Sequence, residues 1–274
     1  MKDQFYVLLP SNSSMLYFPD NTITRFITQL PQQIRLQGQW TVALTEIQIP
    51  LTIPHLPVEE EERLVSMLSE PYDSNDLNTR STKLDVCYAK PGIYKDVASL
   101  IDEINNLECC VGHIRFKLLR GNYVAIARVC DSACSQITHV VKISKTLRKT
   151  LGLDDGQIDR LFCFSPDIDQ GETTGDRPAN LASVLPDVLL IYTYIIEPYV
   201  VGDVQARLLR SADLGVDRYT YGNTKIKSCS NPMYLPLLLN TFQTIEIDIR
   251  SHLGKPIPFD FGLLAVTLHF KRID

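Results

Sequence analysis

The sequence predicts a mainly β protein, and the clearest evidence lies in its C-terminal part, from Phe242 onward. Two runs there, Thr244–Arg250 and Leu264–Lys271, alternate apolar with polar residues, and a break containing Gly and Pro separates them. A period of two is the strand period, because successive side chains of a strand point to opposite faces. The 16 prolines and 13 glycines fall mostly between such runs, as expected for the loops of a β protein. We therefore expect the chain to end in two strands that belong to the scaffold.

The N-terminal third continues the strand pattern. We expect strands at Phe5–Leu9, Asn21–Leu30 and Ile34–Ile49. In the third of these, the apolar positions change parity halfway along the run. This change predicts a β-bulge near Thr45-Glu46, or burial on both faces of the strand. Trp40, the only tryptophan, is interpreted as a core anchor, with an interface hot spot as the alternative.

The segment Pro50–Asp76 breaks this pattern. It contains four prolines and the acidic run Glu59–Glu62, so it reads as a long connection. Within it, Glu59–Leu68 is expected to form a short helix. The acidic run could bind a cation, but four consecutive carboxylates point in different directions. We interpret the run as a solvated helix start that the helix dipole favours.

The next part of the chain, Lys83–Arg160, has an α+β character. The pattern predicts the order β-α-β-β-β-α, in which Asp96 caps the first helix and Ser144 caps the second. The hairpin between the helices turns at Arg120-Gly121-Asn122, and Gly152 follows the second helix. We therefore expect a β framework built from residues 1–82 and 161–274, with residues 83–160 as an inserted α+β subdomain.

After the insertion the sequence returns to the β framework. Phe162–Pro186 is expected to be rich in loops, Asp187–Glu197 to be a central strand, and Val204–Leu209 to be another strand. Asp213–Ser230 is polar and predicted to be a loop. Met233–Leu239 then leads into the terminal strand pair.

Composition narrows the classes of function. The formal net charge is −5 and no run is rich in Lys or Arg, so we expect no direct binding to nucleic acid. The longest apolar run, Val188–Ile196, is shorter than the roughly 20 residues that a membrane span needs. The N-terminus lacks the apolar run of a secretory signal, and the seven cysteines are an odd number. We therefore expect free thiols and an intracellular site of synthesis.

The cysteine and histidine spacings point weakly to metal chemistry. Cys130 and Cys134 form a C-x3-C pair, and His139 follows five residues later. Zinc takes four ligands in structural sites, and only three candidates stand together here. We interpret them as ordinary side chains, with zinc or a local disulfide as the alternatives. Cys109-Cys110 is interpreted as small apolar packing.

Enzymatic motifs are missing from the sequence. None of the five histidines stands in a nucleophile motif, and neither G-x-S-x-G nor H-E-x-x-H occurs. His269, on the polar side of the terminal strand, is expected at the surface or in an interface. Glycine-rich phosphate loops are also missing. We therefore assign no catalytic, cofactor-binding or metal-binding residues and expect neither enzyme activity nor a cofactor.

Both ends of the chain carry the pattern of a known family, and the middle carries it more loosely. The stretches are Phe5–Ser14, Phe18–Thr22, Leu36–Ile47, Gly202-Asp203, Leu208–Arg210, Phe242–Ile249, Gly254, Ile257-Pro258-Phe259, Gly262 and Val266–Arg272. They resemble the minor capsid (penton) proteins of Polinton/Maverick elements and the related adintoviruses, and transposon-derived proteins of animal genomes. The segment Pro54–Asp76 departs from the aromatic-rich continuation that the family pattern would give.

The resemblance implies an antiparallel jelly-roll β-sandwich of two four-stranded sheets, here with an α+β insertion. It also implies a structural protein of the virion, which forms homopentamers at the five-fold vertices of an icosahedral shell. The implied partners are other copies of the chain and a double-jelly-roll major capsid protein. Assembly inside the host cell, without secretion, is implied too. We expect the subunit contacts at two long polar segments, Pro50–Arg80 and Asp167–Asn180.

Two other classes of function compete with the capsid interpretation. One is a jelly-roll binding module, derived from a mobile element, that recognises a receptor, a glycan or a host protein. The other is an enzyme, chiefly a cysteine protease for capsid maturation. The second would need a paired Cys and His motif, which the sequence does not show.

Overall fold

The computed structural model describes residues 3–71, 83–129, 137–153, 161–164, 172–215 and 219–273. The chain divides into two compact units. The first combines Met1–Ile53 with Pro186–Asp274, and the second is the continuous segment Pro54–Leu185. The insertion is thus wider than the expected residues 83–160. The reason is that strands on both sides of that range, β4 (Leu64–Pro71) and β9 (Leu161–Phe164), belong to its central sheet.

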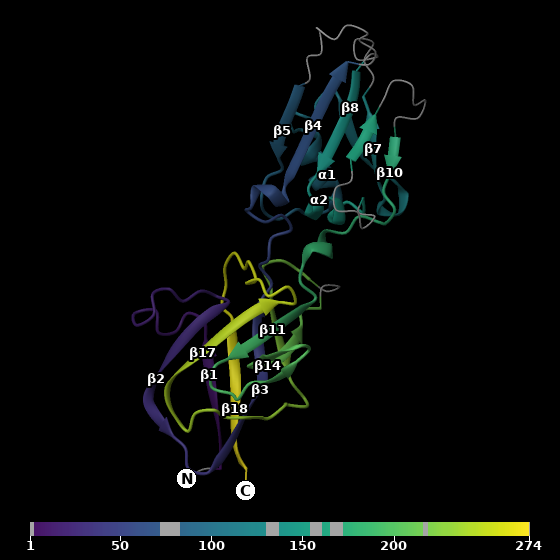
Figure 1. The fold of residues 1–274 in the computed structure, drawn as a ribbon. Helices are drawn as coiled ribbons and strands as arrows, with labels where there is room; N and C mark the ends of the chain where they lie inside the picture. Colours follow the sequence, from purple (N-terminus) through teal and green to yellow (C-terminus); the bar gives the residue numbers. More distant parts are fainter. Residues whose placement is uncertain are drawn as a thin grey trace. The chain divides into compact units, whose positions relative to one another are not determined.

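The first unit, here called the jelly-roll unit, consists of two antiparallel sheets (Figure 1). One sheet has the order β1-β18-β3-β15, and β16 pairs with β3 beside β15. The other has the order β14-β11-β17-β2. Their bounds are β1 Gln4–Pro10, β2 Arg25–Arg35, β3 Gln39–Pro50, β11 Val188–Thr193, β14 Leu208–Asp213, β15 Thr224–Ser228, β16 Leu235–Pro236, β17 Thr241–Ser251 and β18 Ala265–Ile273. A small hairpin joins β12 (Tyr199–Val201) to β13 (Val204–Ala206). This arrangement confirms the predicted mainly β, jelly-roll sandwich.

The core of the jelly-roll unit lies between its two sheets. Alternate residues of the two terminal strands are fully buried there, namely Ile245, Ile247, Ile249, Val266, Leu268 and Phe270. Because β17 and β18 lie in different sheets, the end of the chain contributes to both layers. Trp40 is also buried, and its indole N–H donates a hydrogen bond to the carbonyl oxygen of Gln37 at 3.0 Å. Trp40 is therefore a core residue, as the sequence indicated.

The predicted bulge in β3 is confirmed. Glu46 pairs with Thr267, and the next pair along β18 joins Leu268 to Leu44, so Thr45 is the extra residue. Its hydroxyl donates a hydrogen bond to the carbonyl oxygen of Thr267 at 3.1 Å. This bulge explains the change of apolar parity along β3, because it returns Ile47 to the core face.

The strand expected at Val204–Leu209 is divided between β13 and β14. Strands β2 and β15 also differ from the prediction. Strand β2 continues past its expected end at Leu30 and runs through Pro31. Its pairing with β17 is irregular between Gln29 and Ile34, and β2 lies at a sheet edge, where a missing N–H is tolerated. Strand β15 lies inside the predicted loop Asp213–Ser230. The sequence gives no sign of this strand, because it has only one apolar residue, Ile226, and that residue is exposed instead of packing in the core.

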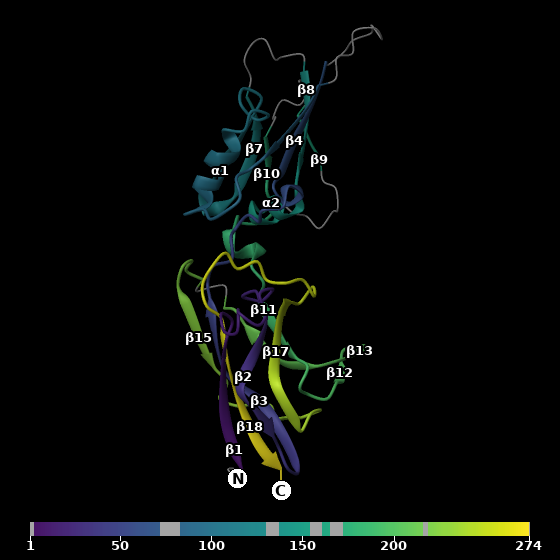
Figure 2. The same cartoon turned by 90° about the vertical axis from the view of Figure 1, so that its left-hand side faces the viewer.

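The second unit, here called the insertion, is built on the four-stranded sheet β5-β4-β8-β9. Its other elements are a three-stranded sheet, two short helices and three 3₁₀ turns. The bounds are β5 Lys83–Tyr88, α1 Val97–Asn105, β6 Ile114–Leu118, β7 Val124–Arg128, β8 Ile137–Ile143, α2 Lys145–Thr150 and β10 Glu172–Thr174, with 3₁₀ turns at Glu60–Glu62, Arg120–Asn122 and Leu181–Val184. Figure 2 shows α1 on one side of the four-stranded sheet.

The insertion has a hydrophobic core of its own. One face of the four-stranded sheet packs against α1 and against strands β6 and β7. Its buried side chains include Val65, Met67, Leu100, Ile101, Ile104, Phe116, Ile126, Val141, Phe162 and Phe164. The predicted helix with an Asp96 cap is confirmed, since the Asp96 carboxylate accepts a hydrogen bond from the backbone N–H of Ser99.

The helix expected at Glu59–Leu68 is wrong. Only Glu60–Glu62 form a single 3₁₀ turn, and the chain then enters strand β4 at Leu64. Strand β4 lies in the middle of the sheet, between β5 and β8. Its backbone bonds to both neighbours outweigh a helix propensity that was modest from the start.

Helix α2 begins after Ser144, the predicted N-cap. The contribution of this cap to the free energy of unfolding can be measured. The Ser144 hydroxyl accepts a hydrogen bond from the N–H of Leu147 and donates one to the carbonyl oxygen of Glu62. We expect Ser144→Ala to lower the free energy of unfolding of the insertion by about 1 kcal/mol. Calorimetric unfolding measures this. Ser183→Ala is the control, because the Ser183 hydroxyl has no hydrogen-bond partner; equal losses in both variants would contradict the cap.

The chain leaves α2 through Gly152, which adopts a positive φ of 71°. A Cβ atom at this position would lie 2.0 Å from the carbonyl oxygen of Arg177, so only glycine fits. Among the described residues, no helix has the length and apolar character to cross a membrane.

Candidate interaction surfaces

The outer face of the β14-β11-β17-β2 sheet is polar and charged. Alternation along β17 puts Glu246, Asp248 and Arg250 on this side, and the register places Arg25 and Tyr192 beside Asp248. We call these five residues the charged face. Arg25 Nε lies 2.8 Å from Glu246 Oε1, and Arg250 Nη2 lies 2.6 Å from Asp248 Oδ2. Hydrogen bonding to these carboxylates raises the pKa of both arginines.

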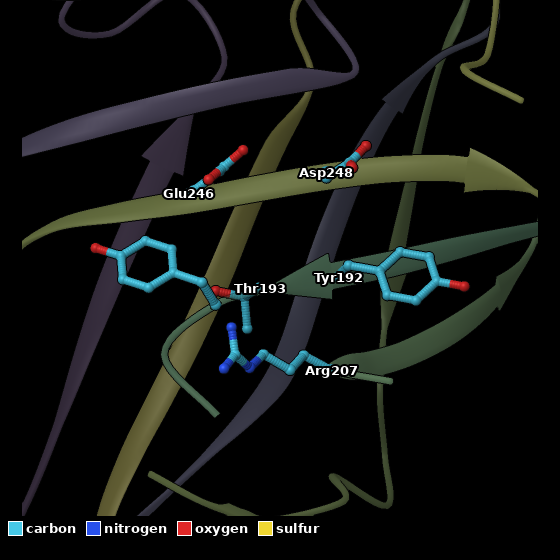
Figure 3. A pocket seen from close by; sticks show the side chains of 6 residues that line it. Tyr192, Thr193, Arg207, Glu246 and Asp248 are labelled. Atoms are coloured by element: carbon cyan, nitrogen blue, oxygen red, sulfur yellow. The ribbon is translucent and has the colours of Figure 1, made fainter. Parts of the chain in front are cut away.

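The charged face is hollowed in two places. A small pocket of about 170 Å³ lies over the end of β11 and is lined by Tyr192, Thr193, Tyr194, Arg207, Glu246 and Asp248. In Figure 3 the Arg207 side chain extends toward Thr193, and both carboxylates come from the neighbouring strand β17. A wider hollow of about 750 Å³ shares Asp248 and continues toward Phe259. The small pocket is below the size of typical small-molecule sites, roughly 300 to 1,000 Å³, and suits a side chain of a protein partner.

The outer face of the other sheet is aromatic and apolar. Tyr6 and Leu8 on β1 are 64% and 62% exposed. The Tyr6 ring stacks on His269 at 4.2 Å between ring centroids, and Tyr234 Oη lies 2.7 Å from His269 Nδ1. Lys271 Nζ lies 5.9 Å from the centre of the Tyr234 ring. We call these five residues the aromatic face.

His269 is less accessible than the sequence suggested. It lies on the outer side of β18 as predicted, but Tyr6 and Tyr234 cover it and only 6% of it is exposed. Burial, and next the charge of Lys271, lower the pKa of this histidine. A neutral His269 therefore supports the two tyrosines, and the tyrosines form the accessible part of the face.

The insertion brings together two histidines that are far apart in the sequence. The rings of His113 and His139 lie 5.0 Å apart, and Ser69 Oγ lies 3.0 Å from His139 Nδ1. Cys130 and Cys134, the other members of the C-x3-C and histidine pattern, lie outside the described residues. Among the residues that the structure describes, no group of three or more His, Cys, Asp or Glu side chains is placed to hold a metal ion.

Buried His139 predicts a pH-dependent stability of the insertion. Its pKa is lowered from 6.5 to about 4, mainly by burial and further by His113 and Arg128. Between these two pH values the unfolded chain binds a proton that the folded chain does not bind. The free energy of unfolding should therefore fall, by up to about 3 kcal/mol, as the pH drops from about 6.5 to about 4.

Calorimetry of the wild type and of His139→Gln at several pH values measures this effect. The variant should lose part of the pH dependence, while His252→Gln, at an exposed position, should keep it. The same pH dependence in wild type and His139→Gln would contradict the prediction.

Cys109 and Cys110 of the insertion are packed in its core, as predicted. Cys109 and Cys110 are buried, with their sulfur atoms 3.8 Å apart. The hydrogen bond to Cys110 and burial both raise the pKa of Cys109, so its reactive thiolate form is disfavoured. Within the described ranges the cysteines are free thiols, namely Cys87, Cys109, Cys110, Cys163 and Cys229.

The fold is similar to that of solved viral structures. The mavirus penton protein superimposes with a TM-score of 0.54, at 11% sequence identity, over 99% of this chain and 100% of the other. The chain has the fold of this viral penton protein. A chain of the Sputnik virophage structure matches with a TM-score of 0.48 and 12% identity, over 99% of this chain and 98% of that one. No protein-family model and no curated protein sequence matches.

Strand pairing also clarifies the two segments expected to carry subunit contacts. Pro50–Arg80 is not a loop, because it contains β4, the inner strand of the insertion sheet. Asp167–Asn180 contains β10, which pairs with β7. The rest of both segments lies partly outside the described residues. Their contact role stays a prediction, but deleting either segment would remove a paired strand.

Proposed function

We propose that this protein is a minor capsid (penton) protein, forming homopentamers at the five-fold vertices of an icosahedral shell of a Polinton-like virus or transposon. The main support is the likeness to the mavirus penton protein, which extends over both units of the chain. The resemblance of both chain ends to the Polinton/Maverick penton proteins points the same way. In this role the protein resides in the virion, acts structurally and assembles inside the host cell.

The jelly-roll unit has the surfaces that a ring requires. A closed ring is built from head-to-tail contacts, in which two different patches of one subunit meet those of its two neighbours. The aromatic face and the charged face differ in chemistry and lie on opposite sheets of the sandwich. We propose that Tyr6 and Leu8 of one subunit pack against the charged face of the next, where the two hollows can receive them.

The second partner in this proposal is a double-jelly-roll major capsid protein, which surrounds each pentamer in the shell. Contacts to it would lie on parts of the jelly-roll unit that the ring leaves exposed. The insertion has a core of its own, so it can vary without disturbing those contacts.

Co-assembly with a major capsid protein of the same element tests the proposal. Both proteins are expressed together, and the resulting shells are imaged by cryo-electron microscopy with and without this protein. We expect density for five copies at each vertex. The Leu8→Asp variant, which should fail to form rings, is the control and should leave the vertices empty. Shells that contain the protein elsewhere, or that never incorporate it, would contradict the proposal.

A further inference from the structure

In the described part of the insertion, the hydrophobic core packs on one face of the four-stranded sheet. The core side chains of β4, β8 and β9, such as Met67, Val141 and Phe164, point to one side of the sheet. The alternate residues on the other side are also mostly apolar. They are Leu64, Leu68, Leu84, Val86, Tyr88, Val140 and Leu161, and we call them the apolar face.

The register makes the apolar face continuous. Leu84, Leu68 and Val140 form a row across three adjacent strands, which Cys163 extends onto the fourth. Four members of the face, at its edges, are well exposed: Leu84 at 62%, Leu161 at 54%, Val86 at 45% and Tyr88 at 40%. The largest apolar patch of a typical soluble monomer covers roughly 300–600 Å² and often has a function, and this face falls in that range.

We propose that the apolar face is a self-association surface, on which the insertion of a second copy of this chain packs face to face. Two sheets that pack in this way form the standard sandwich, with a spacing of about 10 Å and strands aligned within about 30°. An apolar sheet face that meets an identical face is matched in both shape and polarity. The inference does not rest on the proposed capsid role.

Two charged side chains flank the apolar row and make the pairing self-complementary. Glu70 of β4 lies two residues beyond Leu68 toward one end of the sheet, and Lys142 of β8 pairs with Ser66, two residues toward the other end. Both are exposed. A two-fold axis that runs across the strands at the level of Leu68 places Glu70 of the other copy opposite Ser66, which is the cross-strand neighbour of Lys142, so these two long side chains come within reach of each other. Opposite charges then meet on both sides of the apolar row.

The size of the face sets the strength of the contact. Four strands spaced about 4.8 Å apart, with about six residues each at 3.3 Å per residue, cover roughly 400 Å² per copy. Two copies would bury roughly 800 Å², about half of a standard interface near 1,600 Å². We therefore expect a weak, concentration-dependent association. A two-fold contact is not one of the contacts of a five-fold ring, so it would form between single copies whether or not rings are present.

Sedimentation velocity of the full chain over a wide concentration range tests the inference. As the concentration rises, the mass of the wild type should double reversibly. The starting point is the oligomeric state that the chain has at low concentration. Leu84→Asp and Val86→Asp should each weaken the doubling by about tenfold or more, because each places a carboxylate in an apolar contact. Leu118→Asp, at an exposed residue of β6 outside the face, is the matched control and should leave the doubling unchanged.

A charge exchange tests the geometry independently of the apolar residues. Lys142→Glu and Glu70→Lys should each weaken the doubling, and the double variant should restore it, since opposite charges then meet again. The free, exposed thiol of Cys163 adds a native probe. A short bismaleimide should join two chains, and Cys163→Ser should prevent this.

Three outcomes would overturn the inference: no doubling in the wild type, doubling that Leu84→Asp and Val86→Asp leave intact, or no rescue in the double charge variant. A fourth is that the two aspartate variants lower the unfolding temperature without changing the mass, which would mean that the chain itself covers this face. A failure of ring formation leaves the doubling of single copies intact, so the two proposals fail separately.

Discussion

Phe270→Ala should be among the most destabilising single substitutions in the jelly-roll unit. Phe270 is fully buried on β18, and its ring stacks on Phe5 at 4.7 Å and on Phe242 at 5.8 Å between centroids. The truncation removes contacts between both sheets and leaves a cavity, so we expect a loss of about 3–5 kcal/mol in the free energy of unfolding. Denaturant unfolding followed by Trp40 fluorescence measures this loss, because the only tryptophan lies in the same core.

Phe261→Ala is the matched control for this experiment. Phe261 belongs to the same unit but is 53% exposed, so its truncation should cost less than about 1 kcal/mol. Losses of similar size for Phe270 and Phe261 would show that the two sheets do not enclose the core described above. A large loss for Phe270 alone would confirm that the terminal strand is integral to the fold.

Leu8→Asp should break the proposed ring without unfolding the subunit. Leu8 is 62% exposed on β1, an edge strand, so a polar residue there is compatible with the fold. In the ring, the variant places a carboxylate where an apolar side chain meets the neighbour, beside Glu246 and Asp248 of the charged face. We expect each subunit contact to weaken by at least about 2 kcal/mol. Because the same loss recurs at all five contacts, the ring should no longer form.

Native mass spectrometry at fixed concentration measures the ring population. Val200→Asp is the control, since Val200 is 69% exposed in the β12–β13 hairpin of the same unit and belongs to neither face as defined above. The control should keep the rings, and circular dichroism should show both variants folded. Intact rings in Leu8→Asp would exclude the aromatic face as the contact.

Most of the jelly-roll unit could be predicted from the sequence, because most of its strands alternate buried apolar residues with exposed ones. The Thr45 bulge was predictable for the same reason, since a change of parity in an alternating strand requires an extra residue. Strand β15 was not predictable, because it has no alternation of buried apolar and exposed polar residues. Its one apolar residue, Ile226, faces solvent, and the Lys225 ammonium donates a hydrogen bond to the carbonyl oxygen of Leu214. Its strand character comes from pairing with β3 and not from its own pattern.

The error at β4 has a physical cause that bears on function. Leu64 and Leu68 stand four residues apart, which is helical spacing, while Val65 and Met67 follow strand spacing. Both sets are present because one set faces the core of the insertion and the other belongs to the apolar face. A strand that is apolar on both sides imitates a helix in a short window.

The candidate surfaces themselves could not be predicted, because they are made by register between strands far apart in the sequence. The aromatic face joins Tyr6 to His269, and the charged face joins Arg25 to Glu246. The sequence did indicate His139, but its neighbour His113 comes from the end of another strand and had no signal of its own. Resemblance at the chain ends indicated the fold, and the structural likeness to the mavirus penton protein supports it over the whole chain.

The solution mass of the purified protein tests the central claim most directly. Light scattering coupled to size exclusion at low concentration, with negative-stain images of the same peak, gives both mass and symmetry. We expect a five-membered ring with five times the 31.0 kDa of one chain. A stable monomer or dimer that stays so when the major capsid protein is added would contradict it, and would favour a jelly-roll binding module instead.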